Sequence, residues 1–263
     1  MTRIAHLTDL HFGADNPVVV RALIDTLNVD PPDLVAISGD LTQGARRGEF
    51  QAARAFIDAL HAPTLVVPGN HDITPYKLAE RFLVPYRRWH QEIAPETEPA
   101  WQDQTVAVIG LNTARRAGWH PDWSRGRITK PRLVRLLSRL DVVPAGLVRI
   151  VVAHHPLLPP ETLPLTTVVG GAARALEAFA EHGVRLVLAG HLHRSYSRMA
   201  PDLGAGGVLR PAEGSQPMIL QGGSATSTRL RGEPNAFGRV DIDSAGAIQV
   251  QRFIWTGVAW QAG

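Results

Sequence analysis

The sequence contains no cysteine among its 263 residues, so disulfide bonds and thiolate metal ligands are excluded. Any metal site must use oxygen atoms and imidazole nitrogens. Long hydrophobic runs are also missing, and no apolar segment approaches the roughly 20 residues that a membrane-spanning helix needs. The chain starts with a short strand-like run, Ile4 to Thr8, and not with a long apolar stretch and cleavage site. We therefore expect no membrane span, no export and a cytoplasmic location.

Excess charge is small as well. The formal net charge is +3, which is too little to imply nucleic acid, so nucleic acid is a less favoured partner. Several arginines could nevertheless face an anionic substrate, namely Arg115, Arg116, Arg125, Arg127, Arg229 and Arg231. Scattered solvated charge is the competing interpretation, because charged residues lie mostly at protein surfaces.

Short apolar runs alternate with segments of helical period, which predicts an α/β fold. The expected strands are 4–8, 34–37, 64–67, 106–111, 148–153, 186–189, 218–221, 238–242 and 248–254. One expected helix begins at Pro17, with Asn16 as its N-cap, and three others cover 50–60, 133–140 and 172–182. We expect one domain over 1–263, in which 1–195 forms the α/β core and 196–263 supplies strands that complete a second sheet.

Polar clusters follow the carboxyl ends of five expected strands. They are Asp9-Leu10-His11, Gly39-Asp40, Gly69-Asn70-His71-Asp72, His154-His155-Pro156 and Gly190-His191-Leu192-His193. Ligands of open α/β sheets bind in the crevice outside the carboxyl ends of the strands, so we expect the five clusters to converge there.

Spacing within the clusters is suited to chelation. In Asp9-Leu10-His11 and His191-Leu192-His193, an extended backbone would place the two polar side chains on one face and the leucine on the other. The glycines at 39, 69 and 190 fit sharp turns or a close approach of the backbone to a bound group.

The mixture of oxygen and imidazole donors favours manganese, iron, zinc or cobalt over calcium and magnesium. The candidate metal ligands are Asp9, His11, Asp40, Asn70, His154, His191 and His193. Seven ligands are too many for one ion, but two ions at about 3.5–4 Å can share them if one carboxylate bridges. Asp40 is the candidate bridge, because its negative charge would relieve the repulsion between two cations.

In order and spacing, the five clusters resemble those of the calcineurin-like metallophosphoesterases, whose motifs are Asp-x-His, Gly-Asp, Gly-Asn-His-Asp, His-x-Pro and Gly-His-x-His. The resemblance implies an α/β sandwich of four layers (αββα), with two packed mixed sheets flanked by helices. It also implies how the candidate ligands divide. One metal would be held by Asp9, His11 and His193, the other by Asn70, His154 and His191, and Asp40 would touch both.

The same resemblance implies roles for residues that do not bind metal. His71 would lie beside the scissile phosphate as charge stabiliser or acid, and Asp72 would orient it. The choice of His154 over His155 follows the family's His-x-Pro spacing, since alternation along the strand leaves both open. The chain looks most like the bacterial cyclic-nucleotide phosphodiesterases and glycerophosphodiesterases of this family.

These features predict a metal-dependent hydrolase of a small phosphodiester, in which a water bridging two metal ions loses its proton and attacks phosphorus. The alternatives are a phosphomonoesterase, a nuclease or a lipid-linked pyrophosphatase on the same scaffold, and a non-catalytic binding scaffold. A homo-oligomer is also compatible with the sequence.

Other motifs have two interpretations each. We expect His6, His61, His90 and His182 to be structural or exposed. The loop 119–123 is either a wall facing the substrate or a surface loop pinned by two tryptophans. Gly222-Gly223-Ser224 offers either backbone amides to a phosphate or a plain turn.

Overall fold

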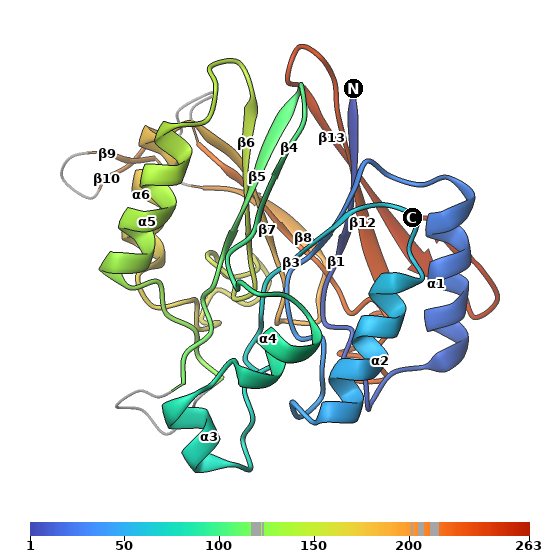
Figure 1. The fold of residues 1–263 in the computed structure, drawn as a ribbon. Coiled ribbons are helices and arrows are strands. Elements are labelled where there is room, and N and C mark those ends of the chain that lie inside the picture. Colours follow the sequence, from blue (N-terminus) through green and yellow to red (C-terminus); the bar gives the residue numbers. More distant parts are fainter. Residues whose placement is uncertain (117–121, 123, 201, 205–207, 211–215) are drawn as a thin grey trace.

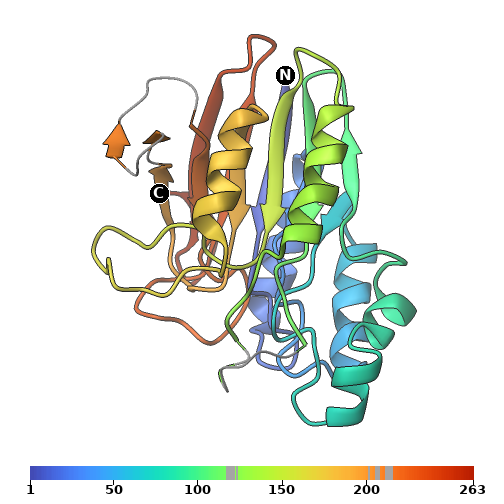
Figure 2. The same ribbon diagram turned by 90° about the vertical axis from the view of Figure 1, so that its left-hand side faces the viewer.

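Two six-stranded mixed sheets pack face to face, and helices cover the outer face of each (Figures 1 and 2). The computed structural model describes residues 1–116, 122, 124–200, 202–204, 208–210 and 216–263. The four layers confirm the expected αββα architecture. Among the helices in these residues, none combines the length and hydrophobicity that a membrane crossing requires.

The first sheet joins the start of the chain to its end. Its order is β14-β13-β12-β1-β2-β3, and β1, β2 and β3 are parallel. The strands are β1 (Thr2–Leu7), β2 (Leu34–Ile37), β3 (Thr64–Val66), β12 (Ala236–Ile242), β13 (Ile248–Trp255) and β14 (Trp260–Ala262). Its outer helices are α1 (Pro17–Val29), α2 (Arg47–Asp58) and α4 (Arg87–Glu92), and α3 (Leu78–Leu83) lies below them in Figure 1.

The second sheet has the order β4-β5-β6-β7-β11-β8, with β5, β6, β7 and β11 parallel. The strands are β4 (Ala100–Gln102), β5 (Val106–Leu111), β6 (Val148–Ala153), β7 (Val184–Ala189), β8 (Tyr196–Met199) and β11 (Met218–Gln221). Helices α5 (Lys130–Asp141) and α6 (Ala172–Glu181) lie side by side on its outer face (Figure 2). A separate two-stranded sheet pairs β9 (Asp202–Gly204) with β10 (Val208–Arg210).

The strands after residue 195 are divided between the two sheets, whereas we expected them to complete only the second. β8 and β11 extend the second sheet, but β12 pairs antiparallel with β1 and brings β13 and β14 with it. The physical reason is that β1 has β2 on one side only, so β12 pairs its other edge. Local sequence pattern identifies such strands but not the edge that they join.

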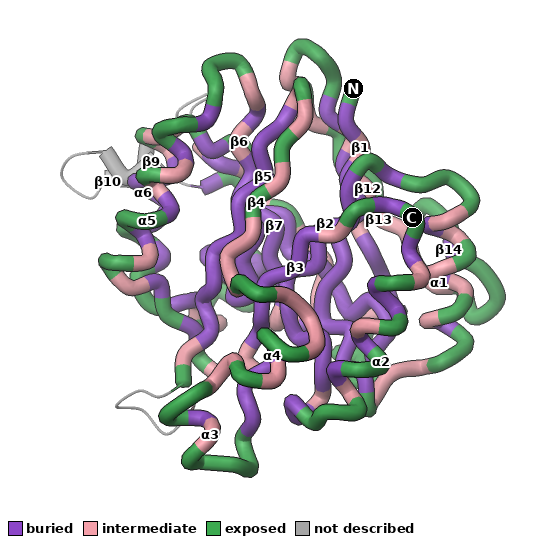
Figure 3. The backbone as a smooth tube through the Cα atoms, viewed as in Figure 1, coloured by how far each residue is buried: buried purple, intermediate pink, exposed green. Residues whose placement is uncertain are grey.

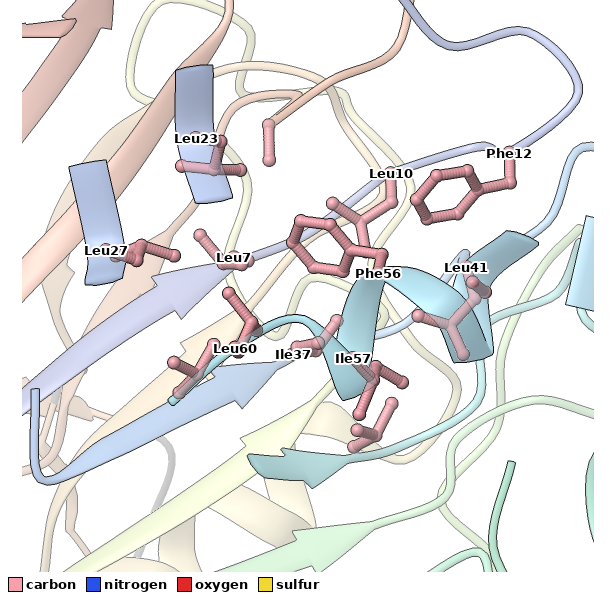
Figure 4. Close-up of a cluster of buried hydrophobic side chains, with 14 of the residues drawn as sticks. Leu7, Leu10, Phe12, Leu23, Leu27, Ile37, Leu41, Phe56, Ile57 and Leu60 are labelled. Carbon is pink, nitrogen blue, oxygen red and sulfur yellow. The ribbon is translucent and has the colours of Figure 1, made fainter. Parts of the chain in front are cut away.

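Three apolar cores hold the layers together. Between the sheets lie Ile4, Leu34, Val108, Ile150 and Leu188, all fully buried. Figure 3 shows the strands buried at the centre and the outward faces of the helices exposed. In the core between the first sheet and its helices, Leu23 and Leu27 of α1 and Phe56 of α2 lie close to Leu7 of β1 (Figure 4). Leu10, which separates Asp9 from His11, is buried in that same core and anchors the loop that follows β1.

Helix α1 begins where its sequence predicts. The Asn16 side chain accepts a hydrogen bond from the Val18 amide, and Pro17 occupies the first turn. Helices α3 and α4 and strand β4 were not expected, because six- and three-residue elements show too little periodicity to be recognised.

Candidate metal centre

All seven candidate ligands gather where the parallel strands of both sheets end. Asp9 and His11 follow β1, Asp40 follows β2, Asn70 follows β3, His154 follows β6, and His191 and His193 follow β7. Backbone hydrogen bonds tie these loops together, from Asp9 N to Gly39 O at 3.1 Å and from Gly190 N to His154 O at 2.8 Å. The expected convergence of five distant clusters is therefore present in the structure.

The backbone of these loops adopts an uncommon conformation. Left-handed φ angles occur at Asp9 (53°), His11 (51°), Asp40 (52°), His191 (80°) and His193 (55°). The expectation of an extended segment was therefore wrong for both Asp-x-His and His-x-His. The left-handed residues still turn both polar side chains toward the centre. Such backbone strain typically persists where the surrounding structure enforces it for function.

Around Asp9, three donor atoms face one another at similar distances. His11 Nε2 and His193 Nε2 each lie 3.6 Å from Asp9 Oδ1. His11 Nε2 is also 3.6 Å from Asp40 Oδ2. A separation of 3.6 Å is too long for an ordinary hydrogen bond.

On the other side of Asp40 a second group assembles. His154 Nε2 lies 3.3 Å from Asp40 Oδ2 and 3.2 Å from Asn70 Oδ1. The imidazole of His191 packs on that of His154, with ring centroids 5.2 Å apart. Asp40 therefore borders both groups.

These distances suit donors that share a cation. Two ligand atoms that each lie about 2.1 Å from one ion are ~3.0 Å apart at a right angle and ~3.4 Å apart at the tetrahedral angle. The observed separations of 3.2–3.6 Å are close to this range. The same donor types, oxygen and imidazole nitrogen, are those that transition metals bind.

Several of the donor atoms lack any hydrogen-bond partner among the described residues. They are Asp9 Oδ1, His11 Nδ1 and His11 Nε2, and both side chains are fully buried. Buried polar atoms without partners destabilise a fold, so they are rare unless another group satisfies them. A metal ion would satisfy Asp9 Oδ1 and His11 Nε2 together. The residues present therefore fit a metal centre.

The buried carboxylates of Asp9 and Asp40 are negatively charged and need positive charge nearby. Burial alone would raise the pKa of Asp9 and of Asp40, but neighbouring histidines outweigh it and hold both pKa values below the usual range. In turn, burial lowers the pKa of His154 while Asp40 raises it, and the net effect is a pKa of about 9. Without metal, the proton on His154 supplies the positive charge that the carboxylates require.

His154 and His155 differ in the availability of their ring nitrogens. His155 Nδ1 is hydrogen-bonded to Thr113 Oγ1 at 2.7 Å, and its Nε2 donates to the Ser124 carbonyl at 2.8 Å. His154 Nδ1 donates to the Ser38 carbonyl at 2.8 Å, which leaves Nε2 directed at Asp40. The structure therefore favours His154 as the ligand, a choice that the spacing of residues along the strand left open.

Hydrogen bonds from neighbouring residues orient the candidate ligands. Thr8 Oγ1 donates to Asp9 Oδ2 at 2.8 Å, and the His191 amide donates to the same oxygen at 2.8 Å. Ser224 Oγ is hydrogen-bonded to His193 Nδ1. Ser224 belongs to the Gly222-Gly223-Ser224 motif, which we had interpreted as a phosphate-binding loop or a turn. Its actual contact was not predictable, since no local pattern links residues 193 and 224.

His71 lies beside this centre. Its ring packs edge-on against the His11 ring, with centroids 4.8 Å apart. Its Nδ1 donates to the Gln43 carbonyl at 2.7 Å, so Nε2 is directed outward. A ring nitrogen of His71 is also within 4.8 Å of donor atoms of His11 and Asp40. The metal content of a protein without His71 therefore decides whether this residue is a metal ligand.

Asp72 does not orient His71 as we expected. Its carboxylate accepts hydrogen bonds from the Gly69 amide, the Leu41 amide and both the amide and hydroxyl of Thr42. Burial and the charge of Asp40 raise the pKa of Asp72 to about 6. Asp72 thus braces the loop that carries Asp40, and Gln43 holds the His71 ring.

Glycines at the strand ends allow the loops to approach closely. A Cβ on Gly69 would lie 2.0 Å from Asp40 Oδ1, and one on Gly190 would lie 1.8 Å from Thr8 Oγ1. Both approaches are shorter than any real contact, so no larger residue fits. These two glycines therefore allow a close approach to neighbouring side chains, and the predicted approach to a bound group stays a prediction.

Replacement of Gly69 by alanine should disrupt the site, because a Cβ there would lie 2.5 Å from the backbone nitrogen of Asp40 as well as against its carboxylate. The new methyl group would displace the Asp40 carboxylate, so we expect Gly69→Ala to lower bound metal and activity by at least about tenfold. Gly48→Ala on α2 is the matched control, because its Cβ would meet nothing within 4 Å. Metal analysis and circular dichroism of both variants test this. Normal metal content in Gly69→Ala would contradict it.

The remaining sequence expectations have varied outcomes. His6 is buried and hydrogen-bonded to Ser38, while His61 and His90 are exposed and His182 is half-buried against Ala178, in agreement with structural or surface roles. In the loop 119–123, only Asp122 is among the described residues, so the proposed substrate wall lies outside them.

A buried cluster of carboxylates and imidazoles at this edge of a four-layer sandwich defines a class of protein, the metal-dependent phosphoric ester hydrolases. Sequence comparison agrees, because a profile of the calcineurin-like phosphoesterases matches residues 2–195. The chain belongs to the calcineurin-like phosphoesterase family.

Curated relatives carry phosphodiesterase names. The chain is 28% identical over 210 residues to a probable cyclic nucleotide phosphodiesterase of Synechococcus sp., which covers 73% of this chain and 74% of the relative. A glycerophosphodiester phosphodiesterase of Enterobacter lignolyticus is 38% identical over 80 residues, 26% of this chain and 29% of its own. A probable glycerophosphodiester phosphodiesterase of Arcobacter nitrofigilis is 27% identical over 170 residues, 64% of this chain and 59% of its own. The match therefore spans less than two thirds of both glycerophosphodiesterases.

Solved structures share the fold. Purple acid phosphatase PPD1 from yellow lupin superposes with a TM-score of 0.70 at 13% identity, over 99% of this chain and 52% of the lupin chain. A dimetal phosphatase from Danio rerio superposes with a TM-score of 0.62 at 14% identity, over 91% of this chain and 92% of that one. At these identities the likeness concerns the fold alone.

Proposed function

We propose that the protein is a dinuclear metallophosphodiesterase acting on a small phosphodiester, such as a cyclic nucleotide or a glycerophosphodiester. The observation that carries the proposal is the position of Asp40 between two groups of donors, with His11 Nε2 at 3.6 Å and His154 Nε2 at 3.3 Å from the same carboxylate oxygen. One metal would be held by Asp9, His11, Asp40 and His193, the other by Asp40, Asn70, His154 and His191.

Two ions held there would neutralise phosphoryl oxygens and make a water acidic enough to serve as nucleophile near neutral pH. The chain's own residues would supply the rest. His71, fixed through Nδ1 by the Gln43 carbonyl, presents Nε2 toward the leaving-group oxygen, where it stabilises developing charge or donates a proton. Asp72 keeps the Asp40 loop in place.

A small pocket beside the centre supports a substrate with an organic group on the His191 side. It has a volume of about 200 Å³ and is lined by His191, Leu192, Ser124, Thr166 and Val168, among others. The lining also includes the ion pair of Arg125 and Asp122, so the pocket offers hydroxyl, charged and apolar groups to the polar alcohol or sugar portion of a small ester. The names of the curated relatives, cyclic nucleotide and glycerophosphodiester phosphodiesterases, agree with such substrates.

Metal analysis combined with a substrate panel tests the function. We expect about two metal ions per chain, of manganese, iron or zinc, and faster hydrolysis of bis(p-nitrophenyl) phosphate than of p-nitrophenyl phosphate or single-stranded DNA. A preference for the monoester or for DNA would replace the proposal by a phosphomonoesterase or a nuclease. Two bound metals with no turnover of any substrate would favour a non-catalytic scaffold.

Metal affinity should depend on pH through His154. Its pKa is about 9 without metal, against an ordinary 6.5, because Asp40 outweighs burial. The stability gained from the protonated pair is fully present below pH 6.5 and is lost as the pH rises through 9. A ligating His154 must lose this proton, so affinity should rise by up to about tenfold per pH unit until pH 9. Calorimetry in buffers of different ionisation enthalpy measures the released proton; constant affinity over this interval would contradict the prediction.

A further inference from the structure

The segment that follows β11 runs along the metal-site loops and is firmly attached to them. The Ala225 amide donates to the Thr8 carbonyl at 2.9 Å, Thr226 Oγ1 donates to the Leu10 carbonyl at 2.8 Å, and the Thr228 amide donates to the Ala14 carbonyl at 2.8 Å. These hydrogen bonds fix the position of the backbone at the next residue, Arg229.

The guanidinium group of Arg229 reaches back to the centre. Its Nη1 lies 3.4 Å from His71 Nε2, the ring nitrogen that faces outward. Arg229 itself is exposed at the mouth of the site.

Within the described residues Arg127 and Arg231 form no ion pair either, but Arg229 differs from the other singled-out arginines in lying beside His71. Arg125 is paired with Asp122 at 2.9 Å, Arg115 donates to the Asp122 carbonyl, and Arg116 donates to the Phe82 carbonyl. Within the part of the chain that the structure describes, no carboxylate forms an ion pair with Arg229. A cation without a counter-ion thus lies beside a centre suited to two further cations.

Two divalent ions and a guanidinium group would carry more positive charge than Asp9 and Asp40 neutralise, so the site would attract a further anion. We propose that Arg229 is a substrate-binding residue that holds a non-bridging phosphoryl oxygen of the ester, next to the leaving-group oxygen that His71 faces; this rests on the proposed function. Arginine suits the task because its planar, permanently charged fork binds phosphate oxygens through two parallel hydrogen bonds. The same contact would hold inorganic phosphate, the simplest anion with this geometry.

Binding of inorganic phosphate to the metal-loaded protein tests the proposal independently of turnover. We expect Arg229→Gln to weaken phosphate binding roughly 10- to 100-fold, as loss of a hydrogen bond to a charged group does. Arg229→Lys should restore part of this affinity, because it keeps the charge but not the fork. Arg231→Gln, at another exposed arginine of the same segment, is the matched control and should change affinity by less than about twofold. Isothermal titration calorimetry gives these constants.

Two further measurements separate the outcomes. Metal content and melting temperature should be equal in all variants, and the KM for bis(p-nitrophenyl) phosphate should rise in Arg229→Gln more than kcat falls. Phosphate affinity that is unchanged in Arg229→Gln at normal metal content would overturn the role of Arg229 while leaving the proposed function intact. A wild-type protein that neither binds metal nor hydrolyses any ester would overturn both.

Discussion

Asp40→Asn should remove most of the bound metal and reduce kcat/KM by about 10³-fold or more. The substitution keeps the shape of the side chain but removes the negative charge that His11 and His154 face from either side. Loss of several kcal/mol of charge stabilisation corresponds to a factor of this size. Metal analysis and steady-state kinetics measure both effects.

The same Asp-to-Asn substitution at a surface position is the control for Asp40→Asn. Asp25→Asn removes a carboxylate that is 59% exposed on α1 and paired with Arg21, so metal content and activity should stay at wild-type values. The bridging role of Asp40 would be refuted by an Asp40→Asn protein that still holds two metals and turns over normally. Loss of one metal alone would assign Asp40 to a single ion.

His71→Ala should reduce turnover by roughly 10²- to 10⁴-fold and leave metal content unchanged, as expected for a group that acts on the substrate and not on the ions. The ring contacts His11 edge-on and is held through the Gln43 carbonyl, so its removal leaves the hydrogen-bond partners of the proposed ligands in place. If His71 donates a proton, the loss should be larger for an alkyl leaving group than for p-nitrophenolate, which leaves without protonation.

The exposed His61→Ala variant serves as control and should behave as wild type. Two results would contradict the assignment of His71. Unchanged turnover would remove it from the reaction, and a loss of metal in proportion to activity would make it a ligand beside His11 and Asp40, whose donor atoms are within reach.

Much of the site was predictable because its chemistry is carried by short motifs next to strands. A buried strand such as Val148–Ala153 shows in the sequence as an uninterrupted apolar run, and the polar residues that follow must lie at its carboxyl end. The positions of Asp9, Asp40 and His154 at the ends of strands therefore follow from the sequence. The extended backbone predicted for the loops that carry these residues was wrong, since left-handed conformations leave no clear pattern in non-glycine residues.

Contacts between distant loops were not predictable. Ser224 behind His193, Gln43 behind His71 and Thr42 beneath Asp72 each join residues that are about 30 positions apart or more, without a spacing rule between them. The short elements α3, α4 and β4 were missed for a different reason, because their burial comes from tertiary packing and not from periodicity.

The amino-acid sequence alone determined the alternation of strands and helices, the donor types and the exclusion of thiolate, because each depends on local residue identity and order. Only the tertiary structure decided that β12 joins β1, that His154 and not His155 faces Asp40, and that Arg229 reaches His71. These outcomes depend on which loops the packing of two sheets brings within a few ångströms, and distance along the chain does not determine distance in space.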